Sequence, residues 1–143
     1  MSELSYYQSR SGKLSCSAEE AFNFITDLRN FRRFIKEGTI SDWNAEKDSC
    51  SFSVSMVGTV NLRLIEKETP RKVIFHGDAL SKNDFIINVD LSDNSSDPAE
   101  LKLSLSASLN PVMKMMADKP ISQFLEILMK EIEDFRDWNN TTG

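Results

Sequence analysis

Few side chains in this sequence could carry out catalysis or hold a metal ion. His76 is the one histidine, and the two cysteines, Cys16 and Cys50, are far apart in the chain. A zinc or haem site needs several histidine, cysteine or carboxylate ligands that converge, and a serine or cysteine nucleophile would need His76 as its base. His76 falls on the polar face of a predicted strand, where a solvated histidine is the favoured interpretation. We therefore assign no catalytic residue and no metal ligand, and we expect no cofactor.

Acidic side chains are numerous, but acid–base catalysis by paired carboxylates needs two of them in one pocket. Most acids here fall on polar faces of the predicted strands or of the last helix. Asp78 and Asp84 are the pair to inspect, because they lie near the ends of neighbouring predicted strands. A catalytic role for either is the less favoured interpretation, since aliphatic and phenylalanine side chains dominate the predicted interior.

Basic residues recur at helical spacing in one short segment, at Arg29, Arg32, Arg33 and Lys36. They are expected to form one basic face, opposite a face that carries Phe31, Phe34 and Ile35. One interpretation is a docking patch for an anionic partner, headgroup or ligand tail. The favoured alternative is a solvated face whose positive charge also suits the C-terminal end of a helix.

A cluster of methionines, Met113, Met115 and Met116, opens the last helix, and Met56 ends a predicted strand. Methionine is flexible and polarizable, so it suits apolar surfaces that must adapt to different partners. The cluster is interpreted either as a malleable lining for an apolar ligand or as ordinary core packing.

The first part of the chain is predicted to form a strand over residues 4–16, in which Gly12 is a possible bulge or bend. Ser17 and Glu20 then form a capping box, which predicts the start of a helix. A second short helix carries Phe31, Phe34 and Ile35 and ends near Gly38.

From residue 39 the apolar period changes to two, as an antiparallel sheet with one dry and one wet face requires. Leu103 and Leu105 are thus expected to point inward, and Ser104 and Ser106 outward. The segment 39–46 is predicted to be an edge strand with an irregularity, because Ile40 and Trp43 fall on opposite faces. The other inward positions lie in four further strands: Phe52, Val54, Met56, Val60, Leu62, Leu64, Val73, Phe75, Phe85, Ile87, Val89 and Leu91.

The last element is predicted to be a long helix, with Asn110 as its cap and Pro111 in its first turn. Pro120 removes a backbone donor, so a break or kink is expected there. Glu126 and Lys130 are expected to pair on its outer side. Its apolar stripe is Ile121, Phe124, Leu125, Leu128, Ile132 and Phe135.

Length and composition favour one α+β domain over residues 1–143, with 40% hydrophobic and 27% charged residues. The net charge of −5 argues against nucleic acid as a partner. No apolar run approaches the ~20 residues of a transmembrane helix, and residues 1–10 lack a signal-peptide core. The expected location is the cytoplasm, with both cysteines reduced and a disulfide as the minor alternative.

The order of elements resembles the START-like, birch-pollen-allergen-like helix-grip superfamily, SRPBCC, over about residues 3–137. The similarity lies in the helix opened by Ser17-Ala18-Glu19-Glu20-Ala21-Phe22-Asn23-Phe24 and in the leucine-rich strand that runs into Asn110-Pro111. The superfamily includes polyketide cyclase/dehydrase and lipid-transport families. The resemblance implies a curved sheet of seven antiparallel strands around the last helix. It also implies a cavity that holds lipids, sterols, polyketides or plant hormones, and enzymatic activity in a few members.

The leading interpretation is therefore a module that binds or transports a small hydrophobic molecule between the sheet and the C-terminal helix. One alternative is a cyclase- or dehydratase-like enzyme, which would need a buried acid–base group. The other is a protein-interaction domain whose cavity is filled by side chains. The candidate ligand-binding residues are Phe34, Phe52, Val54, Met56, Leu62, Phe75, Phe85, Leu103, Met113, Met116, Phe124 and Leu128.

Overall fold

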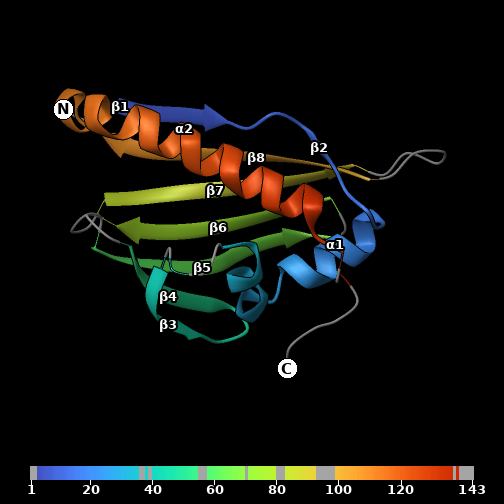
Figure 1. The fold of residues 1–143 in the computed structure, drawn as a ribbon. Helices are drawn as coiled ribbons and strands as arrows, with labels where there is room; N and C mark the ends of the chain where they lie inside the picture. Colours follow the sequence, from blue (N-terminus) through green and yellow to red (C-terminus); the bar gives the residue numbers. More distant parts are fainter. Residues whose placement is uncertain are drawn as a thin grey trace.

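The computed structural model describes residues 3–35, 38, 40–54, 58–69, 71–79, 83–92, 99–136 and 138. Strands and helices follow the expected order, with a short opening segment, two short helices, six strands and a long helix (Figure 1). Their bounds are β1 Glu3–Gln8, β2 Gly12–Lys13, α1 Ala18–Ile25, the 3-10 helix η1 Leu28–Phe34, β3 Ile40–Ala45, β4 Ser49–Val54, β5 Gly58–Glu68, β6 Lys72–Ala79, β7 Asn83–Ser92, β8 Glu100–Leu109 and α2 Pro111–Asp134.

All strands belong to one antiparallel sheet with the order β1-β8-β7-β6-β5-β4-β3, in which β2 also pairs with β8. The curved sheet holds α2 diagonally against one face, and α1 and η1 lie near the C-terminal end of α2 (Figure 1). The predicted first strand is divided, since β1 and β2 are separate pieces that both run along β8. None of the described helices is long and apolar enough to cross a membrane.

Local capping signals place the helix starts as expected. The backbone N–H of Glu20 donates to Ser17 Oγ, and the N–H of Ser17 donates to Glu20 Oε1, both at 3.2 Å. Asn110 Oδ1 accepts a hydrogen bond of 2.8 Å from the N–H of Met113. The expected break at Pro120 is wrong, because α2 is one continuous helix of 24 residues that includes it, whereas the alternative, a kink at Pro120, stays a prediction. Pro120 is exposed and costs the helix a backbone hydrogen bond rather than its continuity.

The period-two pattern of the sheet is confirmed in β8, where Leu103 and Leu105 are buried on the side of α2. Ser106 is half-buried on the other face, but Ser104 is only 3% exposed, against expectation. Ser104 lies on a central strand, with Gln8 of β1 and Asn88 of β7 directly opposite. A small side chain between two longer neighbours is shaded from water even on an open face.

A β-bulge shapes the edge strand β3. Ser41 pairs with Ser53 and Asn44 pairs with Ser51, so two residues of β3 oppose one residue of β4. Asp42 takes the left-handed conformation that the bulge requires, with φ of 54°. The expected irregularity is thereby confirmed, but it brings Ile40 and Trp43 to the same face rather than to opposite ones. Both pack against the core.

Helix α2 has two halves that differ in burial. Its C-terminal half contains the fully buried residues Leu125, Leu128, Met129 and Ile132, of which the sequence stripe missed Met129. Residues 111–124 include no fully buried side chain. Their inward side is half-buried, at Met113, Ala117, Ile121 and Phe124.

Polar contacts also hold the C-terminal half of α2. Glu126 does not take Lys130 as the expected partner but accepts a hydrogen bond of 3.1 Å from Arg10. The guanidinium of Arg10 also contacts Glu133 at 2.6 and 2.8 Å. The missing side chain of Gly12 leaves room for Met129, since a Cβ there would collide with the Met129 sulfur. The opening strand therefore fits closely against this half of the helix.

Replacing Leu105 by alanine should lower the free energy of unfolding by about 2–5 kcal/mol, because it empties a buried position under α2. Ser106→Ala, on the opposite face of the same strand, is the matched control and should be nearly neutral. Chemical denaturation of the two variants measures both effects. Equal costs would show that the register of β8 is wrong.

Candidate functional site

A small cavity lies between η1, the sheet and the C-terminal half of α2, and we call it the closed cavity to distinguish it from the wider spaces described below. Its volume is about 40 Å³, whereas ligand sites usually measure ~300–1,000 Å³. It has room for little more than one water, which occupies ~30 Å³ in the liquid. The residues that line it are all apolar: Ile25, Leu28, Phe31, Phe34, Leu62, Phe75, Ile87, Val89, Leu101, Leu103, Leu128 and Ile132.

Five of the twelve predicted ligand-binding residues line this cavity, namely Phe34, Leu62, Phe75, Leu103 and Leu128. Four of these residues come from the sheet and α2, and Phe34 comes from η1. Side chains of η1 therefore line this space together with the sheet and α2.

The other predicted residues lie outside it. Phe52 is buried and stacks with Trp43 at 5.9 Å between ring centroids, and Val54 is half-buried on the same strand. Phe85 is half-buried, and its ring occupies the space that a side chain at Gly77 would take. Met56 lies outside the described residues.

On α2, Met113 and Phe124 are half-buried on the inward side as predicted. The placement of Met116 inside is wrong, because its side chain is 73% exposed. Helical spacing explains the difference. Met113, Ala117, Ile121 and Phe124 are three or four residues apart, and Met116 follows a different face.

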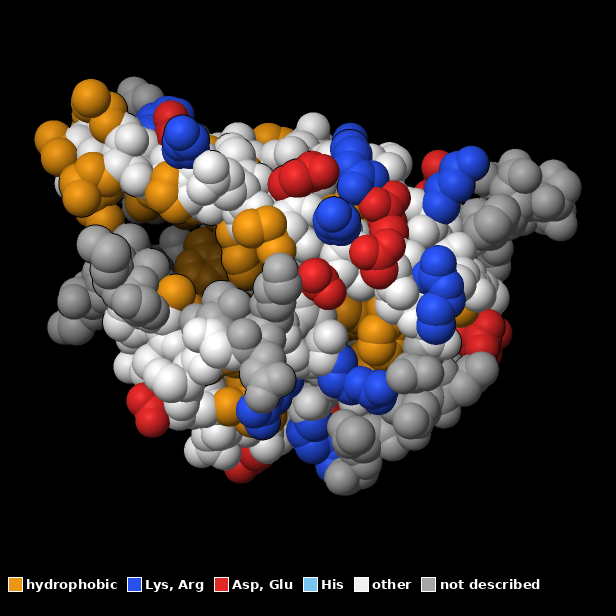
Figure 2. All heavy atoms as spheres, viewed as in Figure 1, with side chains coloured by type: hydrophobic (Ala, Val, Ile, Leu, Met, Phe, Trp, Pro, Cys, Tyr) orange, Lys and Arg blue, Asp and Glu red, His pale blue; other side chains and the backbone are white. Residues whose placement is uncertain are grey.

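A second space lies beneath the N-terminal half of α2. Figure 2 shows that the surface is hollowed there, with hydrophobic side chains at the bottom of the hollow. Because α2 doubles back after Asn110, its first turns lie over the end of β8 (Figure 1). The inward residues of this strand end are Leu105, Ala107 and Leu109, all buried. The side chains at the bottom of the hollow are hydrophobic (Figure 2).

Three polar residues join this half of α2 to the sheet, and we call them the Tyr7 cluster: Tyr7, Lys114 and Asp118. The Tyr7 hydroxyl donates a short hydrogen bond to Asp118 Oδ1. Lys114 Nζ donates to both Asp118 carboxylate oxygens at 3.1 Å and lies 5.9 Å from the centre of the Tyr7 ring. Sequence analysis missed this cluster. The period-two position of Tyr7 and the four-residue spacing of Lys114 and Asp118 were the available signals.

Burial and charge perturb the Tyr7 cluster. Burial, together with the hydrogen bond to Asp118, raises the pKa of Tyr7 to about 12. The same hydrogen bond and the Lys114 ammonium lower the pKa of Asp118. The nearby Ser5 hydroxyl opposes the rise at Tyr7. Ser5 is only 4% exposed, and its Oγ makes no well-formed hydrogen bond to any described residue.

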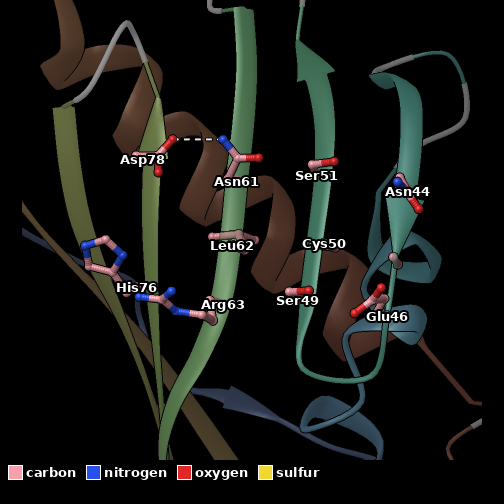
Figure 3. A pocket seen from close by; sticks show the side chains of 11 residues that line it. Asn44, Glu46, Ser49, Cys50, Ser51, Asn61, Leu62, Arg63, His76 and Asp78 are labelled. Carbon is pink, nitrogen blue, oxygen red and sulfur yellow. Dashed lines mark hydrogen bonds between the residues drawn. The ribbon is translucent and has the colours of Figure 1, made fainter.

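An open trough of about 450 Å³ crosses the outer face of β3 to β6 (Figure 3). It forms because the small side chains of Ser49 and Ser51 lie between longer ones on the neighbouring strands. Both acids that the sequence singled out lie on this side of the sheet. Asp78 accepts a hydrogen bond of 2.9 Å from Asn61, and Asp84 lies 3.7 Å from His76 Nε2. Asp78 and Asp84 face each other across β6 and β7 but have separate partners.

The described part of the chain contains neither a disulfide nor a cluster of metal ligands. Cys50 is buried, and burial raises the pKa of its thiol to about 12, so the thiol is protonated at neutral pH. Cys16 and Cys50 are not joined by a disulfide. Among the described residues, no group of three histidine, cysteine or acidic side chains could hold a metal ion.

The described arginines of the predicted basic face of η1 differ in exposure and in their partners. Arg29 binds Asp27 with contacts of 2.7 and 2.9 Å, and Lys36 lies outside the described residues. Arg32 is exposed, whereas Arg33 is half-buried over the rings of Phe24 and Phe135. The three described arginines therefore do not form one solvated basic surface.

The aromatic residues beneath Arg33 form a cluster that sequence analysis did not find. Phe24, Phe34, Phe135 and Trp138 have ring centroids 4.9–5.7 Å apart. Trp138 is 3% exposed, and its Nε1 donates to Ser15 Oγ at 3.1 Å. This cluster anchors the chain beyond α2 to α1 and η1.

Comparisons of sequence identify no relative, because no family model and no curated protein matches this chain. Solved structures do match. A truncated norcoclaurine synthase from Thalictrum flavum has a TM-score of 0.70 at 7% identity, over 94% of this chain and 97% of that chain. A START superfamily protein from Mycobacterium smegmatis has a TM-score of 0.66 at 15% identity, over 90% of this chain and 94% of that chain. The Mll3558 protein from Rhizobium loti has a TM-score of 0.64 at 12% identity, over 92% of this chain and 99% of that chain.

These structural similarities, at such low sequence identity, establish the fold alone. Function does not follow from fold. The chain has the START-like helix-grip fold, with a curved antiparallel sheet around a long C-terminal helix.

The difference between Arg32 and Arg33 can be measured. Arg33→Glu should lower the free energy of unfolding by about 1 kcal/mol, because it removes a cation and its stem from two aromatic faces. Arg32→Glu, on the exposed side, should stay within about 0.5 kcal/mol. Urea denaturation compares them, and equal effects would contradict the packing of Arg33.

The titration of Tyr7 tests the Tyr7 cluster. Asp118→Ala should lower the pKa of Tyr7 below about 12. It should remain above the ordinary 10.0, because burial is the larger cause. A pKa raised on folding adds stability below pH 10, and this stability is lost as the pH rises through 12. The alkaline loss of stability should therefore be smaller in Asp118→Ala and should be complete at a lower pH.

Tyrosinate absorbance measures this titration. The part of the absorbance change that is lost in Tyr7→Phe belongs to Tyr7. Lys119→Ala is the control, since it removes an exposed charge from the same helix. An unchanged Tyr7 titration in Asp118→Ala would show that the hydrogen bond does not form in solution.

Proposed function

From this fold we propose that the protein binds a small, mainly apolar molecule between the N-terminal half of α2 and the sheet. One observation carries the proposal, namely the incomplete burial of the inward apolar side of this half-helix. Met113, Ala117, Ile121 and Phe124 face the dry side of the sheet, yet none is fully buried. Apolar surface that faces a hollow without closing it is typical of ligand sites.

The closed cavity itself is too small for such a ligand. At about 40 Å³ it accepts a water-sized group at most. A ligand would therefore enter from the hollow and displace the N-terminal half of α2 from the sheet. This movement is inexpensive, because residues 111–124 contribute no fully buried side chain, whereas Leu125 to Ile132 keep the other half in place.

The structural neighbours support the same interpretation by analogy. One norcoclaurine synthase structure from Thalictrum flavum, with a TM-score of 0.69, is in complex with dopamine and hydroxybenzaldehyde. The helix-grip fold of that protein thus accommodates small aromatic molecules. That protein is a synthase, but every residue that lines the closed cavity of this chain is apolar. Binding or transport therefore has more support here than catalysis inside that cavity.

A second candidate function is that of a protein-interaction domain with a filled interior. The small volume of the closed cavity favours it, because Phe31 and Phe34 occupy space that a ligand would need. The two functions differ in one measurable property, since only the first predicts stabilisation by small apolar compounds.

Thermal unfolding in the presence of fatty acids, sterols, quinones and aromatic polyketides tests the proposal. A compound at a hundred times its dissociation constant should stabilise the protein by about 2.7 kcal/mol. Ala117→Phe should abolish this stabilisation by filling the hollow from α2, whereas Ser122→Phe, on the exposed side, should preserve it. If no compound stabilises the protein, the interaction-domain function takes precedence.

A further inference from the structure

The first two turns of α2 carry apolar side chains on the face that points away from the sheet. Val112, Met115 and Met116 are 67%, 83% and 73% exposed. Their spacing of three and four residues places them on one side of the helix, and we call them the α2 tip. Figure 2 shows hydrophobic side chains gathered at this end of the molecule, beside the hollow. Exposed apolar side chains that adjoin one another are typical of an interaction site.

These turns are apolar on both sides of the helix, because Met113 and Ala117 lie half-buried on the inward side. A surface helix normally has one polar face, and a helix that is apolar all round is usually covered. In the C-terminal half of α2 the outer face is polar, with Glu126 and Lys130 exposed and Ile127 as an apolar exception. The apolar outer face is thus a property of the tip and not of the whole helix.

The size of the tip argues against a second copy of the chain as its occupant. A stable interface buries about 800 Å² on each partner and involves ~20–30 residues a side, whereas the tip consists of three side chains. A phospholipid surface needs fewer contacts, because apolar side chains that protrude from a helix can sink into the headgroup region. The tip is well placed for this, since α2 begins at one end of the molecule (Figure 1).

The charges along α2 favour one orientation on such a surface. Lys114 and Lys119 outnumber Asp118 in the N-terminal half, whereas residues 125–134 contain four acids and one lysine. Lipid phosphates would therefore repel the C-terminal half and leave the N-terminal turns toward the bilayer. Exposed Asp84 lies at the same end of the sheet as the tip, since β7 begins where β8 ends. Attraction between charges is therefore weak, and apolar contacts must supply most of the affinity.

We propose that the α2 tip docks the protein on the surface of a phospholipid bilayer by inserting Val112, Met115 and Met116 among the lipid headgroups. Burial of apolar side chains drives the insertion, and flexible methionine side chains adapt to an irregular surface. The inference goes beyond the proposed function but is compatible with it. The hollow lies beside the tip, so docking would bring it next to lipid (Figure 2). A small apolar ligand would then pass between bilayer and protein without crossing water.

Sedimentation with sucrose-loaded phosphatidylcholine vesicles, in the absence of any added ligand, tests the docking. The unmodified protein should sediment with the vesicles. This binding should persist at high salt, because salt screens charges but does not weaken apolar burial. Combining Met115→Ser with Met116→Ser should weaken the binding about tenfold for each methionine, because each loses the transfer of an apolar side chain out of water.

Ile127→Ser is the matched control, since it removes an exposed apolar side chain from the outer face of the same helix but outside the tip. It should leave vesicle binding unchanged. All these positions are exposed, so the variants should keep the melting temperature of the unmodified protein. Met116→Trp provides a second readout, because brominated lipid should quench the fluorescence of the added tryptophan. The same lipid should not quench the tryptophan added by Ile127→Trp.

Three contrary results would overturn the inference. The first is a failure to sediment with vesicles, or equal sedimentation of the methionine variant and the unmodified protein. The second is binding that requires anionic phosphatidylglycerol and disappears at high salt, which would show attraction between charges without insertion. The third is a dimer that dissociates in the methionine variant, which would identify a second copy as the occupant. None of these results depends on the ligand panel, so the proposed function is tested separately.

Discussion

One helix has to cover the dry face of a sheet that is seven strands wide, and the rest of the structure depends on how far it succeeds. The 24 residues of α2 extend about 36 Å. Only its C-terminal half buries side chains completely, aided by the contacts of Arg10 with Glu126 and Glu133. Two short helices and the aromatic cluster around Trp138 close the remaining area at that end. The opposite end keeps an apolar surface that is only partly covered.

Sequence reasoning succeeded where structure is determined by local or periodic signals. The capping box at Ser17 and the alternation of Leu105 with Ser106 specify a helix start and a strand face without reference to distant residues. It failed where a single residue changes the register. The bulge at Asp42 reverses the face of Trp43, and no pattern in the sequence reveals which residue will take the left-handed conformation. Pro120 was overestimated, because an exposed helix position tolerates the loss of one backbone donor.

The candidate site shows the same division. The inward residues of the sheet could be predicted because burial follows the period of two. Five of the predicted ligand-binding residues, three from strands and two from helices, do line the closed cavity. Met116 was placed wrongly because a run of methionines does not show which member faces inward. The Tyr7–Asp118 contact joins residues 111 positions apart. Such a pair depends on how α2 lies across β1, which becomes visible only in three dimensions.

The bulge at Asp42 has a consequence for how separate molecules meet. Strand β3 is the outer edge of the sheet, and a flat edge strand offers unpaired backbone groups to another chain. With an extra residue and a carboxylate in its middle, β3 cannot present a continuous ladder. Edge-to-edge growth into larger sheets is thereby discouraged at this position. The same irregularity that packs Trp43 against the core thus also interrupts the edge that a second chain would need for pairing.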